Sequence, residues 1–367
     1  MTGKQRLLAV LRGEPPDRPC WTTLVDDITR SVMPDDWRGL PLLDFYRRLG
    51  CDILQFGNYG LPPGLQVPAP LSYHCPEAAV RHEARSGGTL VQTTRTPWGD
   101  LTATFRSGHP LKHPVETADD LRVFAQLWEH SVPTEAGGVA EAYGRVDAAL
   151  ADDGLFLPTM APSPVQQLLQ LDMGVVAFYR FFQDSRRELL ALLDLMQQAR
   201  CREYEAMAAQ CPVPALIAVE NTSTRLISPA LYRELSLPQI RQYADICHRY
   251  GKRLVLHMCG HLRALLPVLP ETRADAINAL TPPPVGDTTV EMALDALGDS
   301  FPQLGAVLQE TAFQAPETTR EPIWQALDEL YTPRVRAAPL LLWAAADGLP
   351  TPIERFLAVS EWMARQN

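Results

Sequence analysis

Short apolar runs recur along the chain with amphipathic stretches between them. Near-continuous apolar runs, without polar alternation, are typical of parallel strands that are covered on both faces. The pattern therefore predicts eight core strands, at Pro19–Leu24, Asp52–Phe56, Leu155–Thr159, Ala215–Val219, Arg253–Leu256, Ala274–Ala279, Gly305–Leu308 and Leu340–Trp343.

Helices are expected between these strands. Ser228-Pro229 places an N-cap serine before a proline at the first helical position, and Gly251 marks the end of that helix. Thr117 opens another helix, 184–210 is long and amphipathic, and Thr351-Pro begins the last. Eight β/α steps in one chain predict a TIM (β/α)8 barrel with an N-terminal helical lead-in.

One region interrupts this alternation. Residues 79–107 alternate polar and apolar positions around Ser86-Gly-Gly and Trp98-Gly-Asp, which predicts two or three antiparallel strands. We interpret 1–367 as a single domain with a small β insertion at about 60–115, after the second barrel strand.

Composition narrows the class of protein. A net charge of −10 without a basic run argues against a nucleic-acid partner. No apolar run is long enough to cross a membrane, and the N-terminus lacks a secretory apolar core. Seven scattered cysteines are poor material for a disulfide framework, so a cytoplasmic location is expected.

The segment Leu254-Val-Leu-His-Met-Cys-Gly-His261 carries the most informative chemistry. Residues i and i+2 of a strand point to the same face, so His257 and Cys259 project together at the end of the fifth strand. An imidazole beside a thiolate suits zinc, and this end of a barrel is the active-site end. The alternative is a histidine and a cysteine that only pack in the core.

Other strand ends offer partners for this pair. Glu220 and Glu310 each follow an apolar run directly, where a carboxylate is costly unless it is paired or ligates a metal. The preferred zinc set is His257, Cys259 and Glu310, with Glu220 as a fourth ligand or a nearby base. Both glutamates could instead be salt-bridged helix caps.

Substrate-binding candidates also lie at strand ends. Asp26 follows the first strand, Asn58 and Tyr59 follow the second, and Asn221 follows the fourth. Asp26 has the alternative of capping the next helix.

Several segments resemble the uroporphyrinogen decarboxylase superfamily, and within it the corrinoid- and cobalamin-dependent methyltransferase branch. They are Arg6-Leu-Leu-Ala-Val-Leu-Arg-Gly-Glu-Pro-Pro-Asp-Arg-Pro19, Tyr46-Arg-Arg-Leu-Gly-Cys-Asp-Ile53, Leu226-Ile-Ser-Pro-Ala-Leu-Tyr-Arg233, His257-Met-Cys-Gly260 and Ala274-Asp-Ala-Ile-Asn278. The resemblance implies a TIM barrel and zinc on a His-x-Cys pair plus a later cysteine. Here 340–347 has no cysteine, and Glu310 is the replacement ligand we expect.

The resemblance implies a zinc-dependent methyltransferase that moves a methyl group between a small methylated substrate, an ether or a thiol, and a corrinoid. We expect a separate corrinoid carrier protein as partner, and homodimers are common among relatives. Glu220 would protonate the leaving group and Asn221 would position the substrate. Acidic Asp26 and Asp27 stand where decarboxylases carry an arginine-rich segment. The alternatives are a metal-free decarboxylase and a non-catalytic ligand-binding barrel.

Overall fold

The structure is a computed structural model that describes residues 1–314 and 319–366. Two compact units are distinguished: Met1–Pro68, Gly138–Met160 and Cys211–Asn367 form the first, and Ala69–Gly137 with Ala161–Gln210 form the second. Among the described residues, no helix is both long and apolar enough to cross a membrane.

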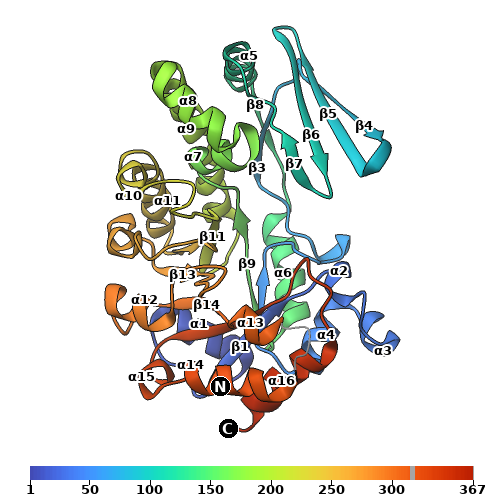
Figure 1. Ribbon diagram of the computed structural model, residues 1–367, viewed down its shortest axis with the longest axis vertical. Coiled ribbons are helices and arrows are strands. Elements are labelled where there is room, and N and C mark those ends of the chain that lie inside the picture. The colour runs from blue at the N-terminus through green and yellow to red at the C-terminus, as the bar shows by residue number, and fades with distance from the viewer. Residues whose placement is uncertain (315–318, 367) are drawn as a thin grey trace. The chain divides into compact units, whose positions relative to one another are not determined.

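The first unit contains the predicted parallel strands (Figure 1). Seven of them form one sheet in the order β1-β15-β14-β13-β12-β11-β10, and β2 pairs with β9. Their bounds are β1 Cys20–Leu24, β2 Ile53–Phe56, β9 Gly154–Leu157, β10 Thr159–Met160, β11 Ala215–Val219, β12 Arg253–His257, β13 Ala276–Asn278, β14 Gln303–Val307 and β15 Leu340–Ala345. The eight predicted strands are thus confirmed, the third one being divided at Pro158.

The strand order is that of a barrel, although the ladders do not run all the way round. Within the described part of the chain, no ladder pairs β1 with β2, but the Asp52 amide donates to the Trp21 carbonyl at 2.8 Å. Every one of the parallel strands except the short β10 contributes a side chain to one buried apolar cluster, which Leu7, Val10 and Leu11 of α1 (Gly3–Arg12) also join. This shared interior is what a filled barrel requires.

Helices cover the outside of the parallel strands (Figure 1). Beyond α1, the helical segments of this unit are α2 Asp27–Arg30, α3 Asp35–Arg38, α4 Leu42–Leu49, η1 Pro63–Leu65, α6 Val139–Leu150, α10 Pro229–Leu231, η4 Tyr232–Ser236, α11 Leu237–Arg249, η5 Leu266–Thr272, α12 Val290–Leu297, α13 Glu310–Phe313, α14 Arg320–Leu330, α15 Pro333–Arg336 and α16 Ile353–Ala364. The Ser228 N-cap and the left-handed Gly251 after α11 confirm the predicted bounds of that helix.

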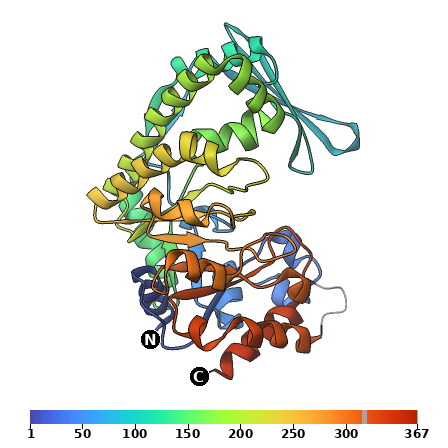
Figure 2. The ribbon, with the colours of Figure 1, turned by 60° about the vertical axis from the view of Figure 1, so that its left-hand side comes forward.

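The second unit holds the antiparallel insertion, drawn as long teal hairpins in Figure 2. Its four-stranded sheet runs β4-β5-β6-β7, and β3 pairs with β8. The strands are β3 Leu71–His74, β4 Ala79–Arg85, β5 Thr89–Thr96, β6 Gly99–Arg106, β7 His109–Lys112 and β8 Val132–Glu135. The helical segments are η2 Ser86–Gly88, α5 Ala118–Glu129, α7 Pro164–Gln167, η3 Leu168–Asp172, α8 Gly174–Asp184 and α9 Arg186–Gln210. The sheet therefore has one strand more than the alternation predicts.

A chain of polar side chains is enclosed in the second unit. The Gln167 amide donates to Asp172 at 3.0 Å, and Arg200 donates to the Gln167 carbonyl at 2.9 Å. Burial raises the pKa of Asp172 to about 6, against the opposing effects of Gln167 and Arg200. Asp172 is therefore a carboxyl group that holds its proton in the folded state at pH values where an unfolded chain releases it.

Replacing Asp172 with asparagine should stabilise the protein at pH 8 by about 1–3 kcal/mol and have little effect near pH 4. Between pH 4 and 6 the folded state binds the proton that the unfolded state has lost. The carboxyl group therefore costs more stability as the pH rises, and an asparagine avoids that cost. Urea unfolding at both pH values measures it, with the exposed Asp184→Asn as control. An equal effect at both pH values contradicts the prediction.

Candidate functional site

Three neighbouring strand ends meet around His257. In the parallel ladders His257 is paired with Val219 of β11 on one side and with Asn278 of β13 on the other. The backbone amides of Glu220 and Asn221 donate to the His257 carbonyl at 3.0 and 2.9 Å. The turn after β11 is therefore fixed to the end of β12. Asn221 adopts φ 46° there, a left-handed conformation that asparagine tolerates better than most residues.

Asn278 sets the orientation of the His257 ring. Its amide nitrogen donates to the Leu304 carbonyl, which turns its oxygen towards His257 Nδ1 at 2.5 Å. That oxygen can only accept, so Nδ1 carries the hydrogen and Nε2 presents a lone pair. Burial lowers the pKa of His257, which the Asn278 contact opposes in part. The result is a neutral imidazole with its lone pair on Nε2, the form that binds a metal.

Aromatic rings support the imidazole from other strands. The His257 ring centroid lies 5.1 Å from Phe56 of β2 and 6.0 Å from Trp343 of β15. Trp343 belongs to a second buried cluster with Leu24, Ala279 and Val307. The histidine thus stands on an apolar floor at the carboxyl ends of the strands.

The Cys259 side chain is fixed by a longer hydrogen bond than that of His257. Its thiol donates to the Asn221 side-chain oxygen at 3.4 Å. Desolvation raises the pKa of this thiol, and the negative charge of Asp347 raises it further. Without a cation beside it, the sulfur therefore stays protonated.

Carboxyl groups from two further strand ends act on one another. Glu310 begins α13 after β14, and Asp347 follows β15. Burial raises the pKa of each, and the charge of Asp347 adds to the effect on Glu310. Asp347 is not among the predicted site residues, although it stands at a strand end in the sequence. Its signal is the acidic residue that ends an otherwise apolar run.

Glu220, the residue directly after β11, is fully buried. Burial raises the pKa of Tyr232, and the charge of Glu220 raises it further, so the two side chains interact electrostatically. Within residues 1–314 and 319–366, no group of three or more histidine, cysteine, aspartate or glutamate side chains is close enough to hold a metal. His257 and Cys259 are donor types that zinc takes. In the described residues they do not form a closed ligand set with Glu310, so that set stays a prediction.

The predicted substrate-binding residues lie at the first two strand ends. Asp26 caps α2 through Thr29, and the same carboxylate accepts from the Gly348 amide at 3.0 Å and from the Tyr59 hydroxyl at 3.3 Å. This is the geometry of the capping alternative. Asp26 and Tyr59 also line a cavity of about 960 Å³. Asn58 exchanges two hydrogen bonds with the Val67 backbone, so its amide fixes the following loop.

Comparison with solved structures finds a full-length likeness. A methyltransferase from Methanosarcina mazei aligns over 100% of this chain and 99% of its own, with 17% identity and a TM-score of 0.60. At 17% identity the likeness shows a shared fold and nothing further. A zinc-bound IOLI protein covers 61% of this chain and 82% of its own at 11% identity, and its TM-score of 0.26 is too low to carry an argument.

Comparison with curated proteins finds no match. Comparison with protein families matches residues 106–332 to the family described as Uroporphyrinogen decarboxylase (URO-D). The matched range covers more than half of the chain and includes the His257–Cys259 strand end, which confirms the resemblance noted in the sequence. The chain belongs to the uroporphyrinogen decarboxylase family.

Proposed function

We propose that the chain is a zinc-dependent methyltransferase that moves a methyl group between a small methylated substrate and a corrinoid on a separate carrier protein. The observation that carries the proposal is the His257 imidazole, whose neutral form is favoured by burial and which Asn278 turns so that the lone pair lies on Nε2. The likeness to the Methanosarcina mazei methyltransferase supports this branch of the family over its decarboxylases. We also propose a closed (β/α)8 barrel for the parallel strands, which their order in the sheet supports.

In this proposal His257, Cys259 and Glu310 hold the metal. Zinc, when bound, supplies Lewis acidity towards an ether oxygen or keeps a thiol substrate as its thiolate near neutral pH. A His/Cys/Glu set carries less thiolate charge than a His/Cys/Cys set, which favours demethylation of an ether. Burial and the charge of Asp347 raise the pKa of both Cys259 and Glu310, and a divalent cation would stabilise their ionised forms.

The other residues act around this centre. Asn221 accepts from the Cys259 thiol at 3.4 Å and fixes the position of the sulfur relative to β11. Glu220 is assigned the proton transfer to the leaving group, because it is the buried carboxyl group of the same turn. Tyr59 and Asp26 border the large cavity and would contact the substrate there.

Metal content and methyl transfer test the proposal together. The purified protein should contain one equivalent of zinc, and Glu310→Ala should lose it while Cys247→Ala, a buried cysteine of α11, keeps it. Demethylation of methyl ethers with a reduced corrinoid protein, and methylation of thiols by methylcobalamin, distinguish the two directions. A protein with neither zinc nor methyl transfer in either direction overturns the proposal.

A further inference from the structure

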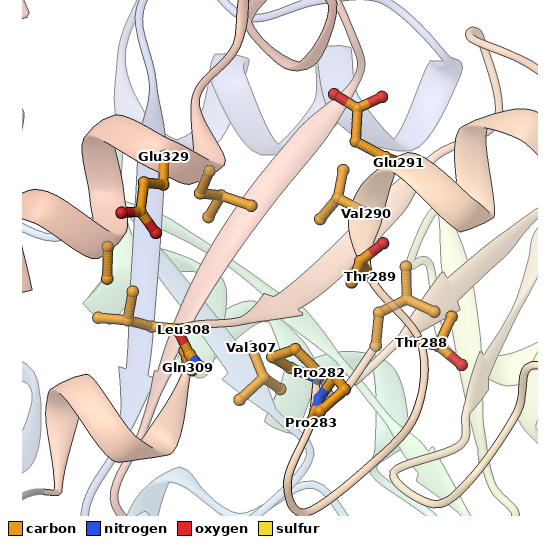
Figure 3. A pocket seen from close by; sticks show the side chains of 13 residues that line it. Pro282, Pro283, Thr288, Thr289, Val290, Glu291, Val307, Leu308, Gln309 and Glu329 are labelled. Carbon is orange, nitrogen blue, oxygen red and sulfur yellow. The ribbon is translucent and has the colours of Figure 1, made fainter.

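A second cavity lies between two helices of the first unit. It measures about 390 Å³, within the range of small-molecule sites. Figure 3 shows its walls: the start of α12, the loop after β13, the end of β14 and the last turns of α14. None of the predicted site residues lines this cavity.

The floor of the cavity is apolar and rigidly placed. Leu280, Val290, Val307 and Leu308 line it and are each less than a tenth exposed. Pro282 and Pro283, in the loop after β13, form one side of the cavity. An apolar ligand group would therefore meet a preformed surface instead of having to open one.

Most polar groups of the wall already have partners. Thr288 donates to Asp287 at 3.0 Å, and Thr289 caps α12 by accepting from the Met292 amide at 3.3 Å. Glu291 accepts from Thr332 at 2.8 Å and pairs with Arg334 at 3.3 Å. These groups stabilise the wall and leave little capacity for a ligand.

Glu329 and Gln309 are the exceptions. Among residues 1–314 and 319–366, the Gln309 side chain has no hydrogen-bond partner, and Glu329 has only the Gln325 amide, at 2.9 Å on one oxygen. Glu329 and Glu291 stand on opposite sides of the cavity, on α14 and α12 (Figure 3). An anion is disfavoured here, because the first turn of α12 carries Glu291 and is already capped.

We infer that this cavity is a binding site for a small organic cation, in which an apolar body rests on the strand ends and an ammonium group faces Glu329. A cation is favoured because the carboxylate of Glu329 is negatively charged, and an apolar body is favoured because the floor of the cavity is apolar. The inference does not depend on the proposed methyl transfer, and binding can be measured on the protein without metal or corrinoid.

The test uses 2-phenylethylammonium as probe, with 3-phenylpropanoate and 2-phenylethanol as anionic and neutral counterparts of similar size. Methyl NMR titrations should show saturable shifts for Leu280, Val290, Val307, Leu308 and Leu330, with the cation binding most tightly. Glu329→Gln should weaken the cation about threefold to fivefold, as for a solvent-exposed ion pair, and leave the alcohol unchanged. Glu321→Gln, on the same helix but outside the cavity, should have no effect.

Filling the cavity gives an independent check. Ala326→Trp adds a large side chain to the α14 wall and should reduce binding of all three probes at least tenfold, while the thermal melt shows that the variant is folded. The inference is overturned if the anion binds as well as the cation, if no saturable shift occurs at these methyl groups, or if a folded Ala326→Trp variant binds like the parent.

Discussion

Replacing His257 with alanine should reduce zinc content to near zero and methyl transfer by at least about a hundredfold. Loss of a residue that merely orients a ligand already costs ten- to a hundredfold in metal affinity, and His257 is the predicted ligand itself. The ring also contacts Phe56 and Trp343, so the variant leaves a gap in the apolar floor. His257→Gln keeps more of that volume and should lose zinc to the same extent.

His82→Ala is the matched control, because the side chain of this exposed histidine of β4 hydrogen-bonds only to Gln92 among the described residues. Zinc is measured by elemental analysis and folding by circular dichroism. A folded His257→Ala protein that retains full activity would rule out the zinc mechanism. A variant that retains zinc but loses activity would indicate that His257 acts in proton transfer and not as a ligand.

The arrangement of the strands could be predicted because a covered parallel strand leaves a distinct pattern. Runs such as Ala215–Val219 and Arg253–His257 are buried along nearly their whole length, and few polar residues interrupt them. The additional strand His109–Lys112 could not be predicted, because it lacks such a pattern. It is an edge strand with mostly exposed residues and a proline, so it carries no apolar alternation.

Part of the candidate site could also be predicted, since the period of a strand places His257 and Cys259 on one side. The contact with Asn278 could not, because it depends on the ladder register between two strands 21 residues apart. Asp26 shows a further limit. A strand-end aspartate has the same sequence signal whether it binds substrate or caps a helix. Its hydrogen bonds in the structure show the cap, and its contact with a substrate stays a prediction.

Gly305 is the residue whose importance depends most on such contacts between strands. It lies in β14, directly beside the side chains that support His257. A Cβ atom at this position would come within 2.9 Å of both the Ala279 amide nitrogen and Trp343 Cε3, and it would overlap the Asn278 amide. Real Cβ atoms do not approach other atoms so closely, so the strand or its neighbours must shift.

Gly305→Ala should therefore destabilise the protein by at least about 2 kcal/mol, as overpacking of a close-packed interior does. It should also reduce zinc affinity, because the displaced Asn278 no longer fixes the His257 ring. Gly144→Ala is the matched control: Gly144 lies inside α6 with no atom within 4 Å of the new methyl group. Helix propensity should make that variant more stable by about 0.5–1 kcal/mol. Urea unfolding measures both, and equal effects at the two glycines would show that the contacts around Asn278 do not constrain the site.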